Sequence, residues 1–168
     1  MLLEPCSGNP LHTRRPCPSL GVSEATRREN TKVATRGVET ATAEALSVLE
    51  HARELVAHAW VPWAWEFVVN HNRKHYCLVG AMYVASSLPA NPAETAVSDV
   101  PAGLKIGIDT LYGELANRYK AEPFTPDTAE SVYINKIRCL ASFNDHCISN
   151  YPVLGLFHRA MTKLRATE

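Results

Sequence analysis

The sequence lacks both a long hydrophobic run and a net charge. No stretch approaches the roughly 18 to 20 apolar residues of a membrane span, and residues 1–10 have neither the cationic start nor the apolar centre of a signal peptide. Lysine plus arginine is 17 and aspartate plus glutamate is 17, so no overall charge attracts nucleic acid or anionic lipid. We therefore expect a cytoplasmic protein with no membrane partner, and the charge balance argues against nucleic acid.

The motifs of the commonest enzyme classes are also missing. There is no phosphate-binding P-loop, no G-x-G-x-x-G and no G-x-S-x-G, which removes the usual nucleotide-binding and serine-hydrolase routes. The histidines and cysteines match no standard zinc spacing, and no paired C-x-x-C knuckle occurs. We therefore expect no metal and no cofactor, and the sequence favours a protein that is not an enzyme.

What is present is typical of one ordinary globular domain. The chain has 168 residues, 46 % hydrophobic and 20 % charged, enough to bury a core without disulfides. Cys77 and Cys139 lie in apolar-periodic runs, as buried free thiols do. Near the start, prolines and glycines gather among polar residues, with few large apolar side chains to offset the entropy of ordering the backbone. We expect residues 1–38 to be a flexible, weakly basic tail and residues 39–168 to be a single domain.

Hydrophobic periodicity predicts a mainly helical fold of about five helices. The expected helices cover about 42–59, 77–88, 104–121, 126–143 and 151–164. Thr125 followed by Pro126 is the clearest helix start, because threonine is a good N-cap and proline suits the first helical position. The polar, proline-rich segment 89–103 is longer than the usual connection, which indicates a mobile loop or a lid.

One small β-hairpin is expected between the first two helices. Residues 65–69 and 74–76 are β-branched or aromatic in part and flank a polar N-H-N-R turn. Trp60, Trp63 and Trp65 fall within six residues. Indole rings are too apolar to leave in water without a reason, so these tryptophans should cover the core or form a binding surface.

The hairpin and its tryptophans carry the leading functional hypothesis, a non-enzymatic binding or regulatory protein that uses a protein–protein surface. Its cationic tip suits a phosphate group or an acidic partner surface. The candidate binding residues are Trp63, Trp65, Arg73, Lys74 and His75. A weak nucleic-acid binder that uses the basic tail and this tip is a further alternative, and the sequence leaves the partner and the oligomeric state open.

Cys77 supports a different alternative, a cysteine-dependent hydrolase or transferase. A thiol in the first turn of a helix feels the positive end of the helix dipole, which favours the nucleophilic thiolate. His146 or His158 could then act as the base, with Asn144 or Asp145 as the residue that orients it. No local signature of a cysteine hydrolase is present, and asparagine and aspartate at a helix end are equally explained by capping.

Two segments together resemble a known family. H-Y-C-L-V-G-A-M-Y-V-A, followed some sixty residues later by L-A-S-F-N-D-H-C, is similar to a family of small uncharacterised proteins of actinobacteria and their phages, a domain of unknown function. The matching positions are Trp60, Cys77, Gly80, Ala81, Phe143, Asn144, Asp145 and Ala160. The match covers about residues 42–166, and it departs from the family at Phe143, where the family has tryptophan. The resemblance implies an accessory factor of an actinobacterium or its phage without a known activity, and it links the Cys77 region to the Asn144–Asp145 region.

Overall fold

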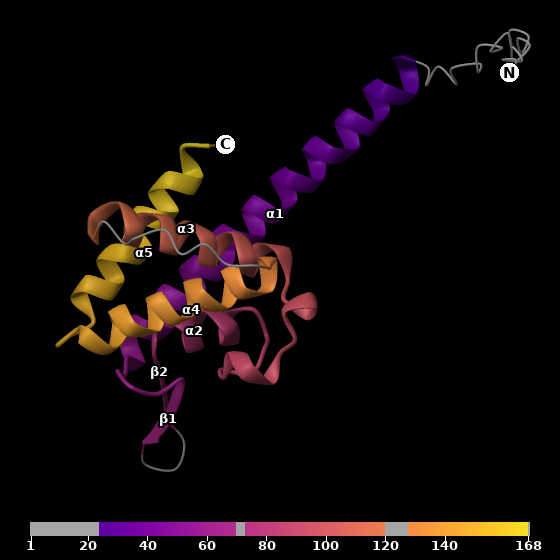
Figure 1. Ribbon diagram of the computed structural model, residues 1–168. Coiled ribbons are helices and arrows are strands. Elements are labelled where there is room, and N and C mark those ends of the chain that lie inside the picture. The colour runs from indigo at the N-terminus through magenta and orange to yellow at the C-terminus, as the bar shows by residue number, and fades with distance from the viewer. Residues whose placement is uncertain (1–23, 70–72, 120–127, 168) are drawn as a thin grey trace, which may run out of the picture.

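The protein is mainly helical with one small hairpin, as predicted (Figure 1). The structure is a computed structural model that describes residues 24–69, 73–119 and 128–167. The elements are α1 (Glu24–Ala59), β1 (Glu66–Val69), β2 (Arg73–Tyr76), α2 (Leu78–Ala85), η1 (Pro92–Glu94), η2 (Val97–Asp99), α3 (Ala102–Tyr119), α4 (Ala129–His146) and α5 (Tyr151–Arg165). Within these residues no helix is both long enough and apolar enough to cross a membrane.

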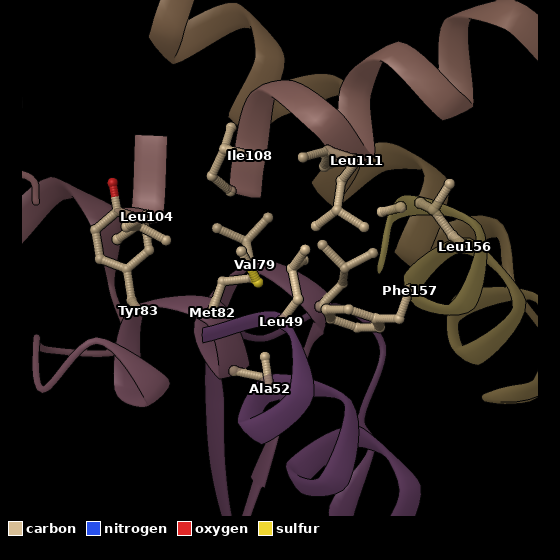
Figure 2. Packing of buried hydrophobic residues seen from close by; sticks show 14 of the residues in the cluster. Leu49, Ala52, Val79, Met82, Tyr83, Leu104, Ile108, Leu111, Leu156 and Phe157 are labelled. Atoms are coloured by element: carbon tan, nitrogen blue, oxygen red, sulfur yellow. The ribbon is translucent and has the colours of Figure 1, made fainter. Parts of the chain in front are cut away.

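The core lies between α1, α2, α3 and α5, and α4 closes it against α2 and α3. Figure 2 shows Leu49 of α1, Val79 of α2, Leu111 of α3 and Phe157 of α5 in this core, and all four are fully buried. Each such side chain stabilises the fold by about 1.5–3 kcal/mol relative to leaving it exposed. The apolar periodicity of the sequence therefore identifies the packed faces of these helices.

The first helix is longer than predicted. It begins at Glu24 rather than near residue 42, so the expected boundary at residue 38 falls inside a continuous helix. Residues 24–38 contain no proline, and extending an existing helix avoids the unfavourable nucleation step. This part of α1 projects away from the other elements (Figure 1). The remainder of the expected tail, residues 1–23, lies outside the described residues.

Two details of α4 also differ from the prediction. Its N-cap is Thr128, whose hydroxyl accepts from the Ser131 amide, and Thr125 lies outside the described residues. Cys139, expected to be buried, is exposed. The buried stripe of α4 runs through Tyr133, Ile137, Leu140 and Asn144, and residue 139 falls between two of its members on the solvent side.

The hairpin forms where the sequence predicts it. β1 and β2 are antiparallel, with Glu66 opposite Tyr76 and Val69 opposite Arg73. At the end of β2, the Tyr76 carbonyl accepts from the Val61 amide at 3.2 Å, which ties the hairpin to the chain that leaves α1. The hairpin therefore sits at the end of the molecule where α1 ends and α2 begins (Figure 1).

Candidate functional site

Asn144 is the buried polar residue of the described part of the chain, with a fully inaccessible side chain. Its Oδ1 accepts from Trp60 Nε1 at 2.9 Å and from the Leu78 amide at 3.1 Å. Its Nδ2 donates to the Val61 carbonyl at 3.4 Å. These bonds join the C-terminal end of α4 to the loop after α1 and to the start of α2. Leaving one of these buried groups unpaired would cost about 1–3 kcal/mol, so the junction stabilises the fold.

Asp145, the next residue, holds the backbone of Trp63. Its Oδ1 accepts the Trp63 amide at 2.8 Å and also lies 3.3 Å from Asn144 Nδ2. Trp63 has a φ of 67°, in the left-handed region that side chains rarely adopt, at a cost of about 1–3 kcal/mol. The structure therefore maintains an unfavourable backbone conformation at this tryptophan.

The Trp63 side chain points largely into solvent, with 73 % of its surface exposed. Its indole lies 6.5 Å from the His146 ring, centroid to centroid. The other large exposed apolar side chains among the described residues are Phe67, Val68, Ile148 and Tyr151. Phe67 and Val68 are successive residues of β1 and point to opposite faces of the hairpin. We call Trp63, Ile148 and Tyr151 the Trp63 surface.

Trp63 lies in the loop after α1, Ile148 lies in the α4–α5 turn, and Tyr151 begins α5. The end of α1 and the α4–α5 turn lie at the same end of the molecule (Figure 1). Asn150 Nδ2 donates to the Val56 carbonyl at 3.4 Å, which fixes the turn to α1. Trp63 was predicted as a binding residue from the sequence, whereas Ile148 and Tyr151 were not. The sequence did contain an indication of this exposure: Ile148 stands in the polar run D-H-C-I-S-N-Y, outside every predicted helix, so it was not expected to be buried in the core.

Cys77 lies beside this site but faces inward, with 2 % of its surface exposed. It is the N-cap of α2, and its Sγ accepts the Gly80 amide at 3.3 Å. Burial, assisted by the negative charge of Asp145, raises the pKa of the thiol from 9.0 to about 11. The thiol is therefore protonated at neutral pH, opposite to the state that a nucleophile needs.

Gly80 explains the Cys-x-x-Gly spacing. A Cβ at this position would lie 2.0 Å from the Trp65 carbonyl oxygen, so only glycine lets the two backbones approach. The same carbonyl accepts the Cys77 amide at 3.4 Å. Cys77 and Gly80 thus build the junction between α2 and the hairpin.

The structure brings Cys77, Asn144 and Asp145 together but not the base that the enzyme alternative requires. Cys77 and Asp145 both line a pocket of about 180 Å³ between Trp63 and Trp65. His146 Nδ1 instead donates to the Ser142 carbonyl of its own helix at 2.7 Å. Among the described residues, no imidazole is hydrogen-bonded to the thiol, and His158 is an exposed residue of α5.

The cationic tip of the hairpin is partly engaged within the protein. Lys74 Nζ lies 3.2 Å from the Glu66 carboxylate, and His75 Nδ1 donates to the Trp60 carbonyl at 3.4 Å. Arg73 is exposed, and Trp65 is half-buried against the core. Of the five predicted binding residues, Trp63 is therefore the one that offers a large free apolar surface.

No protein-family model, curated protein or solved structure matches the chain. The resemblance to the actinobacterial and phage family stays a prediction. In this chain the Cys77 and Asn144 segments meet because Asn144 Oδ1 accepts the amide of Leu78, the residue after Cys77.

Proposed function

We propose that this chain is a non-enzymatic binding protein, an accessory factor of an actinobacterium or its phage, that docks a partner protein on the Trp63 surface. The observation that carries the proposal is Trp63 itself, an exposed indole on a backbone held in the left-handed region by Asp145. An exposed indole on an unfavourable backbone conformation supports a role in binding.

Physical chemistry supports a binding role for such a residue. Tryptophan is the residue type most enriched among those that dominate binding free energy. Fixing its backbone before binding removes part of the entropy lost on association. Ile148 and Tyr151 supply further exposed apolar area, so the partner is expected to present an apolar pocket that receives the indole.

The test uses the full chain as bait in lysate of the native host and then measures the affinity of the captured protein, purified, for each variant. Trp63→Ala is expected to weaken binding about 30-fold, which corresponds to a loss of about 2 kcal/mol. Arg118→Ala, an exposed α3 position outside the Trp63 surface, is the control and should bind like the parent. A captured partner that binds Trp63→Ala as tightly as the parent would show that this surface is not the docking site.

A further inference from the structure

A second and larger cavity shares one wall residue, Trp65, with the pocket beside Cys77. Its volume is about 570 Å³, and its walls come from segment 91–97, from α4, from Tyr83 of α2 and from Trp65. Ligand pockets for small molecules are typically about 300–1,000 Å³ and mostly apolar. The cavity is lined by the apolar residue Ile134, the phenols Tyr83 and Tyr133, and the charged residues Glu94, Glu130 and Arg138, among others.

Segment 91–97 forms a built wall. The Asn91 side chain accepts the Ala93 amide at 3.1 Å, and the Asn91 carbonyl accepts the Glu94 amide at 3.1 Å. These bonds make the short helix η1, and η2 follows after Thr95 and Ala96. The long polar segment that the sequence marks as a mobile loop or a lid therefore contains two ordered turns that border the cavity.

Two buried tyrosines give the cavity a polar element. The hydroxyls of Tyr83 and Tyr133 lie 3.3 Å apart, and the residues are 1 % and 6 % exposed. Burial raises the pKa of both phenols, so both keep their protons. A pair of phenols has two O–H donors, and the bond between them uses one. The second proton has no acceptor among the hydrogen bonds of the described residues, and an acceptor in the cavity would satisfy it.

The charges at the cavity do not select an ion. Glu94, Glu130 and Arg138 line it but are exposed, and exposed charges at physiological salt contribute little to binding. We propose that this cavity binds an uncharged, largely apolar small molecule that accepts a hydrogen bond from the Tyr83–Tyr133 pair. The half-buried ring of Trp65 at the cavity favours a ligand with a flat body.

The test uses Nile red, an uncharged, flat dye with a carbonyl acceptor, titrated into the full chain and followed by its fluorescence. We expect saturable binding at one site per chain. Ile134→Trp, which fills the cavity from α4, should abolish this binding. A variant with both Tyr83→Phe and Tyr133→Phe keeps the two rings and removes both hydroxyls. It should weaken binding about 10-fold, because the ligand then has no phenol from which to accept a hydrogen bond. Trp63→Ala should leave dye binding unchanged, so this proposal and the partner proposal fail separately.

Loss of dye binding in Ile134→Trp is informative only if that variant folds. Circular dichroism checks that Ile134→Trp folds, and Ala96→Trp, an exposed position on the cavity wall, replaces it if it does not. The proposal is overturned if the dye shows no saturable binding, if it binds the filled variants as it binds the parent, or if Trp63→Ala removes the binding. Unchanged affinity in the variant that lacks both hydroxyls would overturn the assigned hydrogen bond.

Discussion

The Trp63 loop and the start of α2 are both hydrogen-bonded to the C-terminal end of α4, by Asp145 and Asn144 respectively. The two regions nevertheless differ in where their side chains lie. Asn144 accepts the Leu78 amide at the start of α2, and Asp145 accepts the Trp63 amide in the loop. Cys77 points into the core and Trp63 points into solvent. Backbone anchoring by one network therefore serves packing on one side and display of an indole on the other, and substitutions on the two sides should have different consequences.

The largest effect is expected on the packed side, at Gly80. In Gly80→Ala the new methyl group would collide with the Trp65 carbonyl oxygen, since both atoms belong to rigid backbone. The free energy of unfolding should fall by about 3 kcal/mol or more, measured by urea denaturation. Gly37→Ala is the matched control, because its Cβ meets nothing within 4 Å and alanine favours a helix by about 0.5–1 kcal/mol. Equal stability of the two variants would contradict the close approach.

A smaller effect is expected from the Cys77 thiol at high pH. The unfolded thiol loses its proton near pH 9, whereas the folded thiol keeps it to about pH 11. The folded state then binds more protons between these values, so stability is full below pH 9 and decreases toward pH 11, by about 2–3 kcal/mol. Denaturation at several pH values should show this decrease in the parent, and Cys77→Ala should lack that part of it.

Alkylation at neutral pH gives an independent measure of the same burial. Iodoacetamide added to the native protein should modify exposed Cys139 and leave Cys77 unmodified until the protein is unfolded, with mass spectrometry as the readout. Cys139 thus serves as the internal control. Rapid modification of Cys77 in the native state would revive the enzyme alternative and weaken the contrast between the two regions.

The smallest change in stability is expected at Trp63, on the exposed side. Trp63→Asn should raise the free energy of unfolding by about 1 kcal/mol, because asparagine tolerates the left-handed region and the lost indole is mostly exposed. The same variant should bind the captured partner about 30-fold more weakly. Trp63→Ala keeps the backbone cost and removes the indole, so it separates the two effects. A Trp63→Asn protein that is less stable than the parent would show that the indole serves the fold.

The periodic spacing of apolar residues along the sequence predicted which helix faces are buried. The stripe through Leu49 and Val56, the nearly apolar run from Leu78 to Met82 and the hairpin follow from periodicity, and the structure confirms them. The start of α1 was predicted incorrectly, because composition alone does not show that a weakly helical segment continues from a packed helix. Cys139 was predicted incorrectly: it is next in sequence to buried residues of α4, but it lies on the solvent-facing side of the helix.

The candidate site was predictable in its residue types and not in its connections. The sequence by itself determined a helical fold, an apolar Cys77 environment and an unusual concentration of tryptophans. Only the tertiary structure decided that Asn144 joins three segments, that Trp63 and not Trp65 faces solvent, and that Tyr83 and Tyr133 meet across 50 positions of the chain. The physical reason is that apolar burial follows a local period along the chain, whereas a hydrogen bond between distant residues depends on how the helices pack.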